Sequence, residues 1–135
     1  MSTVIRADIS ESNPYYLPKH RYYELKHFCL QYPEWKKRVA ELVKIPGQTI
    51  EKVQTGYGDP VYEAASRREL YLKKMKMVEQ CAIEASPELY TYIIKCVTEG
   101  ASFTYLRTYE GMPCGKEYFY VRYRKFFWCL DRVRE

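Results

Sequence analysis

Apolar residues recur at helical spacing along most of this chain. Spacings of i, i+3, i+6 and i+7 predict a helix from Lys19 to Tyr32. Its apolar face consists of Tyr22, Leu25, Phe28 and Cys29. Pro33 then suits the first turn of a second helix, which extends to residue 43. The apolar face of this second helix consists of Trp35, Val39, Leu42 and Val43.

Proline and glycine mark the boundaries of the next two helices. Residues 44–59 contain three glycines and one proline, a composition typical of a loop. Pro60 follows a capping acid and predicts the start of a long helix that ends near Ala85. Pro87 predicts the start of a further helix that ends at Glu99.

The last third of the chain has a different layout. Ser102 is a capping residue for a short helix from Phe103 to Glu110. Residues 112–115 (Met-Pro-Cys-Gly) form a tight turn, and a longer helix follows from Lys116 to the last residue. Two helices joined by a tight turn are typical of a helix-turn-helix, in which the second helix lies in the major groove of DNA.

No stretch has a β-strand pattern, so the predicted fold class is all-α, a small helical bundle with a C-terminal helix-turn-helix. We expect a flexible N-terminal arm at 1–17, a helical bundle at 18–99 with a Gly/Pro loop at 44–59, and the helix-turn-helix at 100–135. The 135 residues, 47% of them hydrophobic, suffice for one domain with its own core.

Positive charge is concentrated toward the carboxyl terminus. The chain has a net charge of +5, and residues 101–135 contribute +3 of it, from seven basic and four acidic residues. Residues 116–134 of the last helix hold six bases and two acids, interspersed with aromatic residues. Such a helix permits a polyanionic partner.

The last helix divides into two faces. Phe119, Tyr123, Phe126 or Phe127, Leu130 and Val133 are expected to pack against Leu106 and Met112. The opposite face is expected to contact DNA bases through Lys116, Glu117, Tyr120, Val121 and Arg124, with Trp128 further along. The residues expected to contact the DNA backbone are Arg107, Arg122 and Lys125.

Several other classes of protein are not expected. No window approaches 18 apolar residues, and the first 20 residues lack an apolar region, so we expect neither a membrane span nor a secretory signal. The five cysteines form no CxxC pair, and His20 and His27 have no third ligand at metal-binding spacing. The GxSxG, P-loop and dinucleotide signatures are absent. We expect no enzyme, no metal and no cofactor.

Residues 99–135 resemble the C-terminal part of small phage transcription regulators of the RinA/ArpU type, which is related to the helix-turn-helix of sigma-70 region 4. The matching positions are Gly100, Phe103, Leu106, Met112-Pro113-Cys114-Gly115, Phe119-Tyr120, Arg122, Arg124-Lys125-Phe126-Phe127 and Leu130. Arg107 departs from the pattern, since such motifs have a small residue there. The resemblance implies a phage or prophage protein that binds promoter DNA in the cytoplasm of the host bacterial cell, alongside host RNA polymerase.

Two questions remain open from the sequence. Residues of the long helix follow a heptad spacing that fits either a dimer seam or, as we favour, packing on the N-terminal helices: Ala64, Arg68, Tyr71, Met75, Val78, Ala82 and Ala85. A homodimer is still expected, because one small helix-turn-helix buries little DNA. The alternative to a DNA-binding regulator is a phage-encoded, anti-CRISPR-like protein that inhibits a host nucleic-acid enzyme with the same basic and aromatic surface.

Overall fold

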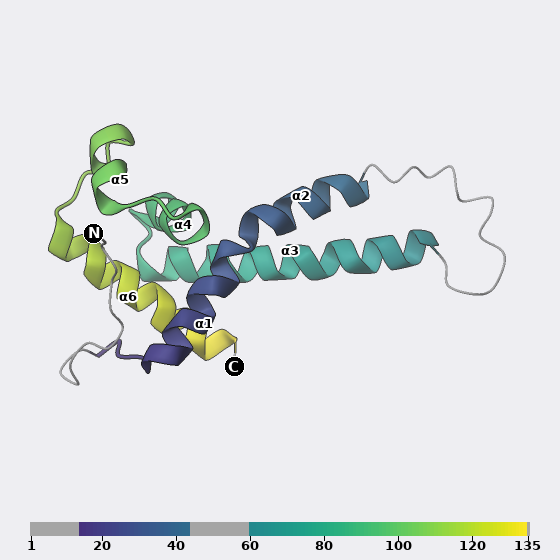
Figure 1. Ribbon diagram of the computed structural model, residues 1–135, viewed down its shortest axis with the longest axis horizontal. Helices are drawn as coiled ribbons and strands as arrows, with labels where there is room; N and C mark the ends of the chain where they lie inside the picture. The colour runs from purple at the N-terminus through teal and green to yellow at the C-terminus, as the bar shows by residue number, and fades with distance from the viewer. Residues whose placement is uncertain (1–13, 44–59, 135) are drawn as a thin grey trace. The chain divides into compact units, whose positions relative to one another are not determined.

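The computed structural model describes residues 14–43 and 60–134 (Figure 1). Within these ranges the chain is helical and has no strand, which confirms the all-α class. The predicted loop at 44–59, residues 1–13 of the predicted arm and Glu135 lie outside the described residues. The described helices are α1 (Lys19–Leu30), α2 (Tyr32–Val43), α3 (Pro60–Ala85), α4 (Tyr90–Glu99), α5 (Phe103–Tyr109) and α6 (Lys116–Val133).

Most helix boundaries lie within two residues of the predicted ones, and the largest difference is at the start of α4. α4 begins at Tyr90, three residues after the expected start at Pro87. The reason is local: the buried Ser86 accepts the backbone N–H of Leu89 through both its carbonyl oxygen and its Oγ, each at 3.2 Å. This turn delays the first helical residue.

Glycine ends two of the C-terminal helices. Gly100 after α4 has φ 77° and Gly111 after α5 has φ 73°, and these are the positive-φ residues of the described chain. A side chain is strained in this left-handed conformation, so glycine is the residue that closes a helix there at least cost. Both glycines therefore help to set where α5 begins and ends.

The chain divides into two compact units. One consists of Tyr32–Lys76, that is α2 with the N-terminal part of α3. Its Trp35 is buried, and the Lys74 ammonium lies 5.7 Å from the centre of the indole ring. In the heptad pattern of α3, Ala64, Val78, Ala82 and Ala85 are buried within the chain, which favours packing over an exposed dimer seam.

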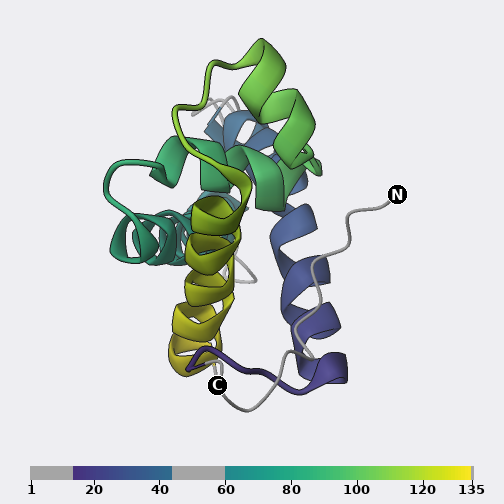
Figure 2. The ribbon, with the colours of Figure 1, turned by 90° about the vertical axis from the view of Figure 1, so that its left-hand side faces the viewer.

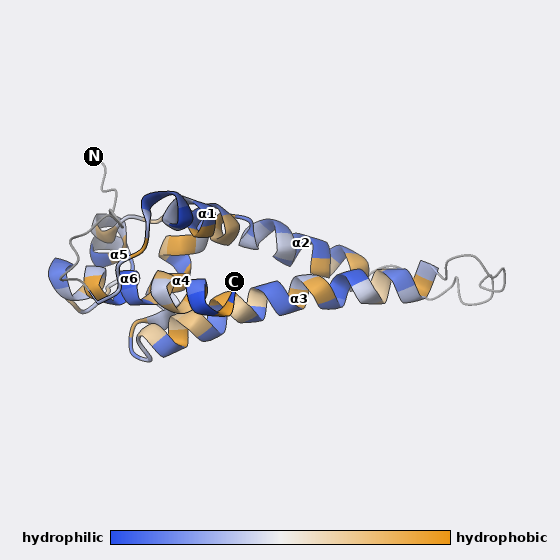
Figure 3. Cartoon of the chain, turned by 90° about the horizontal axis from the view of Figure 1, so that it is seen from below, coloured by the Kyte–Doolittle hydropathy of each residue, from blue (hydrophilic) through white to orange (hydrophobic). Residues whose placement is uncertain are grey.

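The other unit contains α1, the end of α3, and α4 to α6. Helix α1 lies beside α6 and also contacts α4 (Figure 2). Hydrophobic and hydrophilic residues alternate along the helices (Figure 3), and hydrophobic side chains supply the core of this unit. Its largest fully buried side chains include Phe119, Phe126, Phe127, Leu25, Ile93, Leu106, Met112 and Leu130.

The chain before α1 is packed as well. Leu17 is buried, and the ring of Tyr15 lies edge-on to the indole of Trp128, with 5.5 Å between ring centres. Tyr15 and Leu17, which the sequence places in the arm, therefore pack on the unit, whereas Tyr16 between them is 44% exposed. Both side chains are apolar enough to bury surface, which explains why they pack on the unit.

Candidate nucleic-acid interface

Helices α5 and α6 and the turn between them have the layout of a helix-turn-helix. The Ser102 hydroxyl accepts the backbone N–H of Tyr105 at 3.0 Å and caps α5, as its position predicts. The ring centre of Phe103 lies 5.9 Å from that of Phe119 and 6.1 Å from that of Tyr120, so α5 packs on the first turns of α6. Leu106 and Met112 are buried in the same core.

An ion pair joins α4 to the end of α5. The Lys95 ammonium lies 2.9 Å from Oε2 of Glu110, and both side chains are half-buried. The hydrogen bond from Lys95 lowers the pKa of Glu110, although burial acts in the opposite direction. Because α4 also contacts α1, α5 is held against a helix that is itself packed in the unit.

The buried face of α6 is largely the predicted one. Phe119, Tyr123, Phe126, Phe127, Cys129 and Leu130 are buried. Both Phe126 and Phe127 are core residues, where the spacing left the choice between them open. Val133 was wrongly assigned to this face, since it is 53% exposed. It lies in the last turn, where α1 contacts Asp131 and Arg134 instead.

The opposite face brings most of the predicted base-contact residues together. Lys116, Glu117 and Val121 are exposed, and Arg124 is half-buried. Glu117, Val121 and Arg124 are spaced i, i+4 and i+7, so they form one stripe along the first three turns of α6. Tyr120 lies at the edge of this stripe: its ring packs on Phe103, and burial raises its pKa.

Aromatic rings contact most of the cations on α6. Three pairs are four residues apart along the helix: Lys116 over Tyr120 (6.0 Å to the ring centre), Arg122 over Tyr118 (4.9 Å) and Arg132 over Trp128 (4.6 Å). Arg134 lies 3.9 Å from the ring centre of Phe28 on α1. Among residues 14–43 and 60–134, no carboxylate forms an ion pair with a lysine or arginine of α6.

The three predicted backbone-contact residues have different environments. Arg107 is exposed, but its Nη1 donates to the carbonyl oxygens of Met112 (3.2 Å) and Cys114 (3.0 Å) in the turn. Arg122 is half-buried, with Nη1 3.5 Å from the carbonyl oxygen of Ala85 at the end of α3. Lys125 is half-buried on the flank of the stripe.

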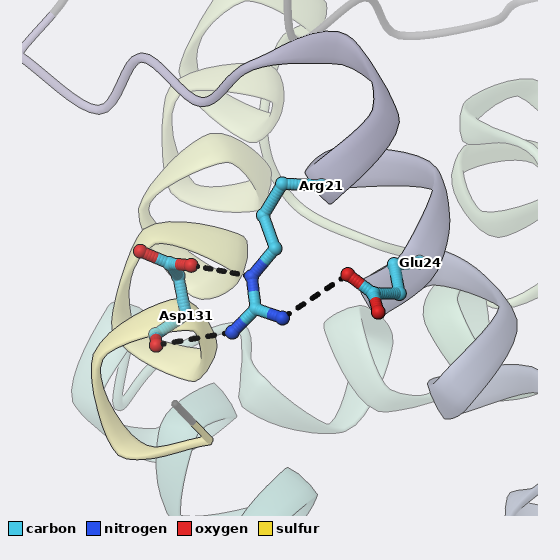
Figure 4. A network of polar contacts seen from close by, with 3 residues as sticks. All are labelled: Arg21, Glu24 and Asp131. Carbon is cyan, nitrogen blue, oxygen red and sulfur yellow. Dashed lines mark hydrogen bonds and ion pairs between the residues drawn. The ribbon is translucent and has the colours of Figure 1, made fainter.

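Polar contacts that the sequence did not predict join α1 to α6. Nε of Arg21 donates to Oδ1 of Asp131 at 2.6 Å, and Nη1 of Arg21 donates to Glu24 at 3.2 Å (Figure 4). Deeper in the unit, the hydroxyl groups of Tyr22 and Tyr123 share a buried hydrogen bond of 2.9 Å. The Arg21–Asp131 pair neutralises one of the two acids of α6, so the helix remains strongly basic.

Comparison with family models, curated proteins and solved structures gives no match. No helix in the described part of the chain is long and apolar enough to cross a membrane. The same residues contain no group of three His, Cys, Asp or Glu side chains that could hold a metal ion, and His20 and His27 are exposed on α1.

Proposed function

We propose that this protein is a sequence-specific DNA-binding transcriptional regulator of phage or prophage origin. The observation that carries the proposal is the stripe of Glu117, Val121 and Arg124 on the first turns of α6, with the exposed Lys116 beside it, directly after a tight turn that packs α5 on α6. In a helix-turn-helix these are the turns that reach base edges in the major groove.

The side chains of the stripe and of Lys116 match the chemistry of that groove. Arg124 and Lys116 can donate to O6 and N7 of guanine, and Glu117 can accept from N4 of cytosine. Val121 offers a methyl surface to the C5-methyl group of thymine. Three types of contact from one helix face are enough to distinguish base pairs.

The stacked cations suit the capture of phosphate. Arg122 and Arg132 lie over rings of their own helix, which restricts their rotamers. A guanidinium stacked by its face still presents N–H groups at its edge, so it can donate to a phosphate oxygen with little further loss of entropy. Lys125, on the flank of the stripe, adds a charge that releases counterions from the duplex.

Two partners complete the proposal. A second copy of the chain would supply a second half-site, because one helix-turn-helix buries little DNA. Host RNA polymerase is the further partner that the likeness to RinA/ArpU-type regulators implies. Light scattering of the free protein and of its DNA complex measures the first of these directly, since a dimer doubles the mass bound to each duplex.

The test is selection of binding sites from a random duplex library, followed by titration of the selected duplex at several salt concentrations. We expect one enriched sequence, and affinity that falls steeply with salt. Arg124→Ala should lose about 1–3 kcal/mol, mainly through one base position. The control is Arg67→Ala, which removes an exposed arginine of α3 and should leave the affinity unchanged.

Two results would contradict the proposal. One is a library without an enriched sequence at moderate salt. The other is an equal effect of Arg124→Ala and Arg67→Ala on binding. Either result, together with retained folding, would favour the protein-binding inhibitor as the function of the same surface.

A further inference from the structure

Arg107 lies on α5, but its side chain belongs to the turn that follows. A single nitrogen, Nη1, lies 3.2 Å from the carbonyl oxygen of Met112 and 3.0 Å from that of Cys114. These two carbonyls flank Pro113, which has no N–H and cannot donate a bond within the turn. The guanidinium thus connects α5 to both sides of the proline.

Apart from the buried side chain of Met112, the turn has few other contacts. The backbone N–H of Met112 donates to the carbonyl oxygen of Leu106 at 3.1 Å, which ends α5. Gly115 caps α6 without a side-chain hydrogen bond, and an added Cβ there would meet no atom within 4 Å. In the described chain, the two bonds from Arg107 are the side-chain hydrogen bonds made to residues 112–115.

We propose that Arg107 is a positioning residue, which holds the turn so that α6 leaves α5 in one direction, and that sequence-specific DNA binding depends on this contact. The part concerning DNA rests on the function proposed above. This role differs from the expected backbone phosphate contact, because Nη1 of Arg107 donates to two carbonyl oxygens of the turn. Loss of Arg107 should loosen the direction of α6 rather than remove one charge from the interface.

The experiment compares Arg107→Met with Lys125→Gln in the full chain. Arg107→Met keeps most of the aliphatic length and removes the donors, so specific binding should fall about tenfold or more, while non-specific binding and its salt dependence stay unchanged. Lys125→Gln removes a charge and should weaken both kinds of binding, with the slope of log K against log salt reduced by about 0.9.

A second change offers rescue. Gly115 lies at the N-cap of α6 with extended backbone angles (φ −85°, ψ 175°), so Gly115→Ser fits without strain and adds a hydroxyl that can accept an N–H of the first turn. If Arg107 acts by positioning, Gly115→Ser should recover part of the specific binding that Arg107→Met loses. A lost phosphate contact would not be recovered by a cap.

Hydrogen exchange of the free protein separates this inference from the proposed function. We expect Arg107→Met to accelerate exchange at the amides of residues 112 and 114–119 and to leave the buried turns of α6 protected. The inference is overturned by unchanged exchange in the turn, or by a salt slope that falls as it does for Lys125→Gln. Accelerated exchange in a protein without any sequence-specific DNA binding would support the positioning role and contradict the regulator.

Discussion

The substitution Phe127→Ala tests the packing on which the orientation of α6 depends. Phe127 is 1% exposed, and its ring lies at the contact between α1 and α6. The ring centre is 5.2 Å from that of Tyr22, 5.0 Å from that of Tyr123 and 4.9 Å from that of Phe126. Removal of the ring therefore leaves a cavity that is lined by residues from both helices.

The expected loss is about 3–5 kcal/mol in the free energy of unfolding. Most of it is the lost transfer free energy of the ring together with the residual cavity. Edge-to-face pairs with Tyr22 and Phe126 add about 0.5–1.5 kcal/mol each beyond the buried area. The upper part of the range is expected, because three neighbouring rings cannot all move to fill the space.

Urea denaturation followed by circular dichroism measures this loss as a shift of the transition midpoint at constant m-value. The matched control is Val133→Ala on the same helix, which removes methyl groups from a residue that is 53% exposed and should change stability by less than about 0.5 kcal/mol. If the midpoint of Phe127→Ala coincides with that of the control, the buried and exposed faces of α6 have been assigned in reverse.

Two further predictions concern buried polar groups of the same unit. Tyr22→Phe leaves the Tyr123 hydroxyl without its 2.9 Å partner and should lower the free energy of unfolding by about 1–3 kcal/mol. The double variant Tyr22→Phe with Tyr123→Phe leaves no hydroxyl unpaired and should be more stable than the single variant. Additive losses of the two substitutions in urea denaturation would contradict this coupling. Burial raises the pKa of Cys81 and Cys96 from 9.0 to about 12, and that of Tyr22 from 10.0 to about 12. These groups keep their protons in the folded state, whereas the unfolded chain loses them above about pH 9. The stability of the fold is therefore unaffected by them below about pH 9 and falls as the pH rises toward 12. A urea midpoint that stays constant from about pH 9 to about pH 11 would refute the burial of these groups.

Local signals in the sequence determined the helices of this protein. Ser102 caps α5, Gly111 closes it, and the apolar spacing that begins at Phe119 assigns the buried face of α6, all within a few residues of one another. Such features depend on backbone geometry and on side-chain periodicity, which neighbouring residues are sufficient to specify. The stripe of candidate base contacts was predictable for the same reason.

Only the tertiary structure decided what each face meets. Tyr22 and Tyr123 are 101 residues apart, and Arg21 and Asp131 are 110 residues apart, yet both pairs join α1 to α6. Amphipathic periodicity shows which face of a helix is buried, but not which other helix covers it, because several helices have similar apolar faces. The shapes of the side chains and how well they pack together decide which two faces meet. Arg107 illustrates the same limit over a short distance: its charge suggested a phosphate contact, and its contact with two turn carbonyls depends on a side-chain conformation that sequence spacing does not contain.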